Sequence, residues 1–259
     1  MTGPENPPSF RLAYVPGATP GKWVRIWEER LPDVPLSLLP VAAAEAPDVL
    51  RAGEADAGIV RLPVDRTVFS AIPLYTETSV VVVPKDHLLT AADEVTVEDL
   101  ADDVVFHPLD DVLDWERPPG KPAVERPATT ADAIELVAAG VGVLVVPQSL
   151  ARLHHRKDLT YRTVTDAPQS GVALSWPEDA HTDLVEDFIG IVRGRTANST
   201  RGRRTEDRAE AGKQKQAAAR RKPAPSKAAS AKGGRPRTGG GAKGTGKGGG
   251  TRGKPRRRS

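Results

Sequence analysis

The sequence predicts an α/β fold followed by a long basic tail, and two observations carry this prediction. In the first sixty residues, short apolar runs typical of strands alternate with stretches of helical periodicity, which implies a parallel sheet covered by helices. After residue 194 the composition changes: residues 195–259 hold 21 Lys and Arg against 3 Asp and Glu, and no Val, Leu, Ile, Met or aromatic residue. Of the chain's 37 basic and 34 acidic residues, 16 and 31 therefore remain in residues 1–194. An acidic body carries a basic tail.

The opening residues supply the clearest alternation of strand and helix. Residues 10–17 (FRLAYVPG) predict a strand that stops at a Pro-Gly turn. The apolar residues of the next segment, 19–34, recur at helical spacing, with Thr19 as the expected N-cap and Pro20 at the first helical position. The remaining elements expected in this region are a strand at 35–41, a helix at 46–56 that ends near Gly53, and a strand at 57–63.

Two later segments have the strongest local signals. The run SVVVVPKDH at 79–87 is largely β-branched, as in strands that are buried on both faces. Residues 129–140 predict a helix with Thr129 as N-cap, Asp132 three residues later and Gly140 as the C-terminal stop. The other expected elements are strands at 69–78, 103–108, 141–147, 159–166 and 171–177, helices at 96–102 (opened by a Thr cap), 148–156 and 179–195, and a proline-rich loop with a short helix at 109–127.

The composition also bounds the chemistry and the cellular location. The chain has no cysteine, so it has no disulfide, thiolate nucleophile or cysteine-held cluster, and it fits a reducing compartment. The start, MTGPENPPS, has neither the basic nor the apolar region of a signal peptide, and no apolar run approaches the roughly 18 residues of a membrane helix. We therefore expect a cytoplasmic protein that does not enter the membrane.

The common enzyme motifs are absent from the sequence. Gly140 and Gly142 follow a predicted helix and precede a strand, whereas a dinucleotide fingerprint needs a strand before it and a helix after it. No Ser-centred nucleophile elbow, phosphate-binding P-loop or HExxH motif is present. We expect no cofactor and no catalytic residue.

Two clusters of metal-ligand residue types are interpreted as surface charge. His154 and His155 are adjacent, so on a helix they point about 100° apart and cannot grip one metal as an i, i+4 pair does. We expect them on a solvated basic face. Asp110, Asp111 and Asp114 lack the spacing of an oxygen-ligand loop, and we expect them to face solvent. The sequence therefore predicts no metal site.

Four segments resemble a known family. They are FRLAYVPGATP at 10–20, LRAGEADAGIVRLP at 50–63, IPLYTETSVVVVPKDHLL at 72–89 and, most specifically, ELVAAGVGVLVVP at 135–147. In their order and in their residues they resemble the effector-binding domain of LysR-type transcriptional regulators, over about residues 10–194. The resemblance implies a type 2 periplasmic-binding-protein fold, in which two Rossmann-like α/β subdomains are joined by two crossover strands and enclose a small-molecule cleft. We place the crossovers near residues 76–79 and 162–166.

The resemblance also sets the expected domain organisation. We expect subdomain I at 10–77 and 165–194, subdomain II at 78–164, and disordered ends at 1–9 and 195–259. Only nine residues precede the first strand, so the winged helix-turn-helix of full regulators is not expected in this chain, nor is operator recognition. Domains of this family often pair side by side, which leaves a homodimer open.

The ligand expected in such a cleft is a small organic anion. Helix N-termini and free backbone N–H groups favour a carboxylate, and hydroxyls from both lobes can close on it. The candidate ligand-binding residues are Pro16, Gly17, Ala18, Thr19, Thr78, Ser79, Thr129 and Thr130. The alternative for Thr19 and Thr129 is that they only cap helices.

The tail predicts a second kind of partner. A flexible polycation binds the phosphates of DNA without regard to sequence, and with no aromatic residue it cannot stack on bases. The candidate nucleic-acid-binding residues are Arg201, Arg203, Arg204, Arg220, Arg221, Lys222, Arg235, Arg237, Lys254, Arg256, Arg257 and Arg258. RNA or another polyanion serves equally, and two alternatives stay open: a merely solvated tail, or a tail that pairs with the acidic body.

Together these observations predict a cytoplasmic, non-enzymatic domain that senses a small molecule for transcription regulation and holds DNA non-specifically through its tail, with association with the nucleoid left open. One alternative is a stand-alone ligand-binding protein whose tail is incidental. The other is an enzyme on the same bilobal fold. Known enzymes of that kind need a Thr-Arg-Phe motif or a cofactor-bearing cysteine, and this chain has neither.

Overall fold

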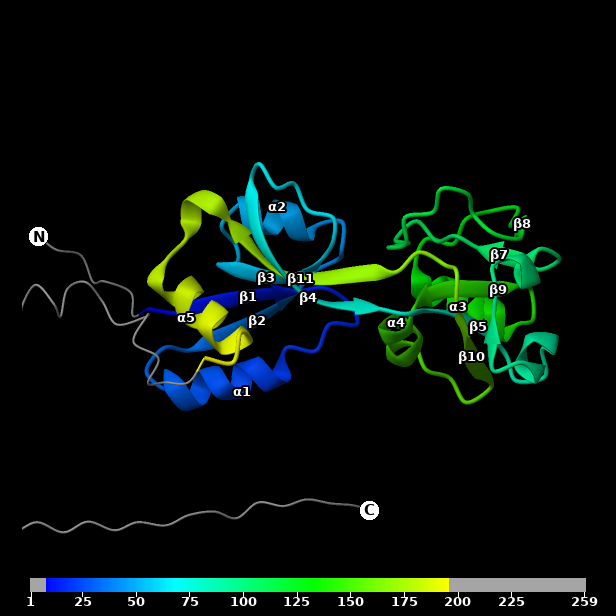
Figure 1. The fold of residues 1–259 in the computed structure, drawn as a ribbon, viewed down its shortest axis with the longest axis horizontal. Coiled ribbons are helices and arrows are strands. Elements are labelled where there is room, and N and C mark those ends of the chain that lie inside the picture. Colours follow the sequence, from blue (N-terminus) through cyan, green and yellow to red (C-terminus); the bar gives the residue numbers. More distant parts are fainter. Residues whose placement is uncertain (1–7, 196–259) are drawn as a thin grey trace, which may run out of the picture. The chain divides into compact units, whose positions relative to one another are not determined.

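The protein forms two α/β lobes, each built on its own sheet (Figure 1). The structure, a computed structural model, describes residues 8–195. The predictions of disorder at 1–9 and 195–259 therefore fall almost wholly outside the described residues. We call the five-stranded sheet with its helices lobe I and the six-stranded sheet with its helices lobe II. The predicted class, two α/β subdomains joined by two crossovers, is confirmed.

The sheet of lobe I has the strand order β2-β1-β3-β11-β4. Its strands are β1 (Phe10–Tyr14), β2 (Leu36–Pro40), β3 (Ala57–Arg61), β4 (Phe69–Glu77) and β11 (Ser170–Pro177). The first three pair in parallel, as the alternation of strand and helix predicts. Strand β11 runs antiparallel to β3 and β4, so the last of the described strands completes the sheet built by the first four.

Three α-helices cover the two faces of this sheet: α1 (Gly21–Arg30), α2 (Ala46–Arg51) and α5 (Asp183–Val192). Helices α1 and α5 lie together on one face and α2 lies on the other (Figure 1). On the first face Phe10 stacks on Trp27 of α1 at 4.7 Å and on Phe188 of α5 at 5.2 Å between ring centroids. This aromatic cluster packs β1 and α1, from the start of the described chain, against α5 near its end in one core. A short 3-10 helix, η3 (Glu178–Ala180), precedes α5.

The sheet of lobe II has the order β6-β10-β5-β9-β7-β8. Its strands are β5 (Ser79–Pro84), β6 (Glu94–Val95), β7 (Val104–Phe106), β8 (Lys121–Pro122), β9 (Val143–Pro147) and β10 (Leu159–Val164). Val80 and Val82 of β5 belong to the core on one face, and Val81 and Val83 to the core on the other. The prediction that this run is buried on both faces is confirmed.

The helices of lobe II are α3 (Thr130–Ala138) and α4 (Gln148–Leu153), with 3-10 turns η1 (Leu88–Ala91) and η2 (Glu98–Leu100). Helix α3 begins as predicted. The Thr129 hydroxyl accepts a hydrogen bond from the Asp132 N–H, and the Asp132 carboxylate accepts one from the Thr129 N–H. Gly140 ends the helical segment with a φ of 73°, a left-handed conformation that glycine adopts without strain.

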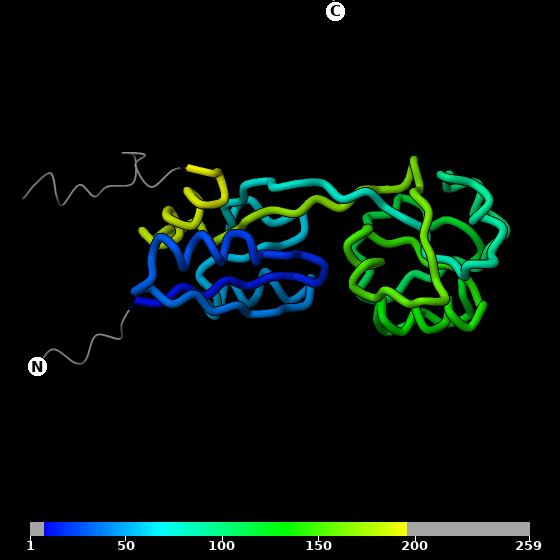
Figure 2. The backbone as a smooth tube through the Cα atoms, turned by 90° about the horizontal axis from the view of Figure 1, so that it is seen from below, coloured from blue at the N-terminus to red at the C-terminus, as the bar shows by residue number. Residues whose placement is uncertain are grey.

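Two crossovers connect the lobes and run side by side between them (Figure 2). The first is Thr78, between β4 of one sheet and β5 of the other, within the predicted 76–79. The second spans residues 165–169, whereas the sequence predicted 162–166. It begins later because β10 stays in the lobe II sheet, pairing with β5 through Thr163 and with β6 through Val164.

Three local predictions are wrong. The N-cap of α1 is Pro20, which makes no capping hydrogen bond, and Thr19 lies one residue before it. The helix expected at 96–102 is only the turn η2, because the Asp99 carboxylate accepts hydrogen bonds from the N–H and hydroxyl of Thr96 and closes the turn locally. Segment 109–127 contains no helix; its only regular element is β8, which pairs with β7.

Within residues 8–195 no helix has the length and apolar character needed to cross a membrane.

Candidate functional site

A cleft of about 840 Å³ lies where the two lobes face each other. Its lobe I wall is the turn after β1, residues 16–19, together with Tyr75 and Glu77 near the end of β4. Its lobe II wall is one side of helix α4, which contributes Ser149 and Arg152. Both lobes therefore contact anything that fills this larger compartment, and its volume suits a small molecule.

A second compartment of about 260 Å³ lies next to the first and shares three lining residues with it. It lies beside the first turn of α3, residues 129–131, and is also lined by Arg61 of lobe I and by Asp110 and His154 of lobe II. Pro16, Ala42 and Leu153 line both compartments, so they stand between the two.

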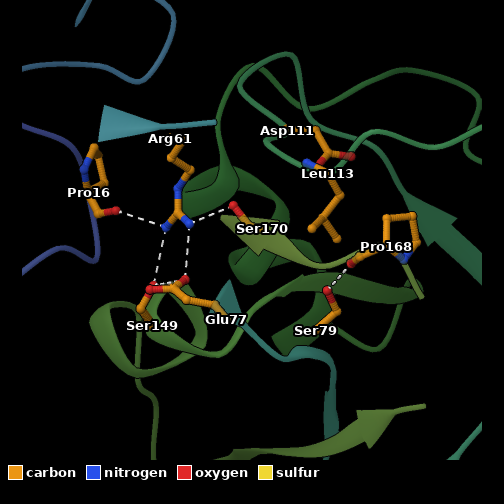
Figure 3. A network of polar contacts seen from close by, with 9 residues as sticks. All are labelled: Pro16, Arg61, Glu77, Ser79, Asp111, Leu113, Ser149, Pro168 and Ser170. Carbon is orange, nitrogen blue, oxygen red and sulfur yellow. Dashed lines mark hydrogen bonds and ion pairs between the residues drawn. The ribbon is translucent and has the colours of Figure 1, made fainter. Parts of the chain in front are cut away.

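The guanidinium of Arg61 is the centre of the polar network that joins the lobes (Figure 3). Its Nη1 donates to Glu77 Oε2 at 3.0 Å and to Ser170 Oγ at 2.8 Å. Its Nη2 donates to the Pro16 carbonyl and to Ser149 Oγ, each at 3.2 Å. The Ser149 hydroxyl in turn donates to Glu77 Oε2 at 2.7 Å. Arg61 thus holds the turn after β1, the paired ends of both crossover strands and helix α4 of lobe II.

The ion pair in this network is buried. The side chains of Arg61 and Glu77 are only 6 % and 9 % exposed, and such a pair persists because each charge has its counter-charge and further hydrogen bonds. Burial raises the pKa of the nearby Tyr75 phenol, the Glu77 carboxylate raises it further, and Arg61 opposes both. Tyr75 therefore stays a neutral hydrogen-bonding group in the cleft at physiological pH.

The approach of the lobes depends on Gly17. Its φ is 84°, and a Cβ placed on it would lie 2.3 Å from the hydroxyl oxygen of Ser149. Only a residue without a side chain allows both this backbone conformation and this contact. The Pro-Gly turn that ends β1 is therefore also one of the places where lobe I contacts α4.

Six of the eight predicted ligand-binding residues line the cleft. Pro16, Gly17, Ala18 and Thr19 line the larger compartment, and Pro16 is shared with the smaller one. Thr129 and Thr130 line the smaller compartment. The sequence left open that Thr19 and Thr129 only cap helices. Thr129 does cap a helix and also faces the cleft, whereas Thr19 caps no helix.

Thr78 and Ser79 line neither compartment. Ser79 is buried, and its hydroxyl donates to the carbonyl of Pro168 in the second crossover (Figure 3). Thr78 is exposed, and its carbonyl accepts a hydrogen bond from the Gln148 N–H at the start of α4. These two residues connect the crossovers and α4 instead of facing the cleft.

Sequence reasoning missed Arg61, Glu77, Ser149 and Ser170, which hold the lobes together, and Asp110 and Arg152, which supply the cleft with charge. Arg61 carried a signal, because it is a charged residue at the end of an otherwise apolar run, AGIVR. The others had no local signal, since serines and charged residues are ordinary at strand ends and on short helices.

The two metal-type clusters have mixed outcomes. Among residues 8–195 no group of three or more His, Cys, Asp or Glu side chains is arranged to hold a metal ion. Asp110, Asp114 and His155 are exposed, as expected. Asp111 is not: its side chain is 12 % exposed and lies 3.6 Å from Nδ1 of His107. His154 is half-buried against the smaller compartment.

The twelve residues predicted to bind nucleic acid, Arg201 to Arg258, lie outside the described residues.

Two α/β lobes, two crossover strands and a cleft lined from both sides define the chain as a bilobed small-molecule-binding module. The family model described as the LysR substrate binding domain matches residues 8–197. The chain belongs to this family, as the resemblance of its four segments predicts.

Curated relatives agree with this assignment. The chain is 27 % identical over 179 residues to the HTH-type transcriptional regulator AlsR of Bacillus subtilis (strain 168), covering 65 % of this chain and 59 % of that protein. It is 26 % identical over 203 residues to the Hca operon transcriptional activator HcaR of Escherichia coli (strain K12), covering 73 % and 68 %. These relatives are transcriptional regulators, which agrees with the prediction of a domain without catalysis, and the chain spans about three fifths to two thirds of their length.

A solved structure of the same architecture is the BenM effector-binding domain with its effector benzoate. It superimposes with a TM-score of 0.59 at 18 % sequence identity, over 74 % of this chain and 96 % of that one. At this identity the likeness shows the fold, and it confirms the predicted bilobal class.

Proposed function

We propose that this chain senses a small organic anion in the cleft between its lobes, as the effector-binding part of a LysR-type transcriptional regulator. The observation that carries the proposal is that both compartments are lined by both lobes. A ligand that contacts two lobes at once stabilises the arrangement in which both contacts are made, and this shift in population is the physical content of sensing.

Three donors in the larger compartment favour an anion. Among the residues that the structure describes, Arg152 forms no ion pair and no hydrogen bond through its side chain, and the N–H groups of Gly17 and Thr19 have no acceptor. A carboxylate satisfies a guanidinium and backbone N–H groups together. The solved BenM domain has benzoate, a carboxylate, as its effector, and this precedent supports the same class of ligand here.

The test is thermal unfolding of the full chain with a panel of monocarboxylates that begins with benzoate. A true ligand at 100 times its dissociation constant stabilises the fold by about 2.7 kcal/mol and raises the melting temperature without being consumed. The Arg152→Gln variant should bind at least about tenfold more weakly, since a charge-assisted hydrogen bond contributes about 1.5–3 kcal/mol and about 1.4 kcal/mol is tenfold. Lys157→Gln, an exposed cation that lines neither compartment, is the matched control. Panel-wide failure to stabilise the protein would contradict the proposal.

We also propose that the basic tail holds DNA or another polyanion without sequence preference. The support is its composition, 21 basic against 3 acidic residues in 65 positions. If about 8 of them neutralise phosphates, the slope of log K against log salt is near −7. On this proposal the protein works in the cytoplasm and colocalises with the nucleoid.

Fluorescence anisotropy of a labelled random duplex separates the tail from the body. The two sheets and the cores that the structure describes use no residue beyond Arg195, so we expect a chain truncated after Arg195 to keep the fold. Binding by the full chain alone, with a steep negative salt slope, is the expected result. Equal binding by the truncated chain, or none by either at low salt, would show that the tail is not a nucleic-acid-binding segment.

A further inference from the structure

The two compartments of the cleft carry opposite unpaired charges. Arg152 lines the larger compartment and has no partner among residues 8–195. Asp110 lines the smaller one, and its carboxylate accepts one hydrogen bond, from the Thr130 hydroxyl at 2.9 Å, with no cation paired to it in the described part of the chain. The charges that face a ligand are therefore positive at one end and negative at the other.

The two charges of the remaining ion pair in the cleft, Arg61 and Glu77, cancel each other. Arg61 lines the smaller compartment and Glu77 the larger, but they are hydrogen-bonded to each other at 3.0 Å and almost fully buried. Two opposite charges this close contribute little net potential to either compartment. His154 adds an imidazole to the smaller compartment, where it serves as a further polar group beside Asp110.

Asp110 also changes what the N-terminus of α3 attracts. The first turn of a helix favours an anion, and here a carboxylate of the chain itself is held there by Thr130. A carboxylate of a ligand at this position would be repelled by the Asp110 carboxylate. A hydrogen-bond donor or cation of a ligand would instead find an acceptor in it.

The residues shared by the two compartments have apolar side chains. The residues that line both compartments are Pro16, Ala42 and Leu153, and none of their side chains offers a hydrogen bond. A ligand that reaches both ends therefore needs a hydrocarbon middle, because a polar group placed there would lose its hydration without gaining a partner.

We propose that the ligand is bipolar: a carboxylate directed to Arg152, a short apolar segment at Pro16, Ala42 and Leu153, and an ammonium or other donor directed to Asp110. This inference rests on the proposed function and narrows the carboxylate ligand to the class of ω-amino carboxylic acids and similar zwitterions. Asp110 is its specificity-determining residue, since it excludes ligands that are negative at both ends.

Titration calorimetry on the full chain tests the bipolar ligand class with pairs of compounds of equal length. The probes are 4-aminobutanoate, 5-aminopentanoate and 6-aminohexanoate, each paired with the dicarboxylate in which a carboxylate replaces the ammonium group. At the length that spans the cleft, the amino acid should bind about tenfold more tightly, because an attraction to Asp110 is exchanged for a repulsion of similar size.

Two variants with matched controls test which end of the ligand contacts Asp110 and which contacts Arg152. Asp110→Asn keeps an acceptor for the Thr130 hydroxyl and should reduce the preference for the amino acid to less than threefold, whereas Asp114→Asn, an exposed aspartate outside both compartments, should leave it at tenfold. Arg152→Gln should weaken both members of a pair alike, and Lys157→Gln neither.

A dicarboxylate that binds more tightly than its partner to the unmodified protein would overturn the bipolar class, as would an unchanged preference in Asp110→Asn. If no member of the series binds while benzoate or another monocarboxylate does, the bipolar class is wrong and the proposed function stands. If no carboxylate of any kind binds, both are wrong.

Discussion

The two lobes contribute different kinds of side chains to the cleft that they share. Lobe I supplies Arg61, a buried cation whose guanidinium donates four hydrogen bonds, whereas lobe II supplies the exposed Arg152 and Asp110, which have no ion-pair partner among residues 8–195. A buried, fully bonded charge cannot be replaced without a large loss of stability, but an exposed one can. In this protein the charge from lobe I therefore holds the lobes together, and under our proposal the free charges from lobe II select the ligand.

The largest expected effect comes from breaking the network on the lobe I side. Arg61→Met leaves the Glu77 carboxylate buried without its counter-charge, so the free energy of unfolding should fall by about 3–5 kcal/mol. Urea denaturation measures this change. Adding Glu77→Leu to Arg61→Met should restore part of the loss, because the uncompensated charge is then gone. A loss below about 1 kcal/mol in the single variant would mean that the pair is as solvated as a surface salt bridge.

The next effect isolates the contact between the lobes at Gly17. Gly140→Ala places a side chain at a φ of 73° with no atom within 4 Å, so it should cost only the backbone strain, about 1–2 kcal/mol. Gly17→Ala has a similar φ of 84° but meets Ser149, and it should cost at least about 1 kcal/mol more. It should also weaken ligand binding, while Gly140→Ala leaves binding unchanged. Equal effects of the two variants on stability and binding would argue against a contact at Gly17 in solution.

A smaller effect distinguishes the two threonines that begin segments facing the cleft. Thr129→Ala removes half of a capping box and should lower the free energy of unfolding by about 1 kcal/mol. Thr19→Ala removes an exposed hydroxyl that caps nothing and should change it by less than about 0.5 kcal/mol. The same denaturation assay compares them, and a larger cost for Thr19→Ala would show that its hydroxyl has a partner in solution.

The smallest effect concerns the end of the body and depends on pH. A hydrogen bond from Arg195 lowers the pKa of Glu186 below its usual 4.5, burial opposes this shift, and His181 adds to it. A lowered pKa means stability that is present above pH 4.5 and is lost as the pH falls through the folded-state value. Since the Glu186 side chain is 38 % exposed, Glu186→Gln should cost only a few tenths of a kcal/mol at neutral pH. The difference in the free energy of unfolding between Glu186→Gln and the unmodified protein should vanish in acid. A difference that grows as the pH falls would mean that the pKa of Glu186 is raised in the folded protein and not lowered.

The sequence by itself determined the elements whose signals are local. Thr129 and Asp132 define the start of α3 because a capping box needs only residues three apart, and the valines of 79–87 define a strand buried on both faces because their burial follows from composition. The alternation over residues 10–61 fixed the parallel part of the lobe I sheet in the same way. The second crossover was misplaced by a few residues because the end of β10 is set by its pairing with β5 and β6, which are distant in sequence.

The cleft was determined only in part. The turn at 16–19 and the start of α3 were found because the resemblance to LysR-type effector-binding domains implies a cleft between two lobes, and these segments hold a strand end and a helix start, where free N–H groups gather. Only the tertiary structure brought Arg61 to Glu77, Ser149 and Ser170, which lie 16, 88 and 109 residues away along the chain. The same is true of the opposed charges of Arg152 and Asp110. Partners at such separations are chosen by the folding of both lobes, and no local pattern records that choice.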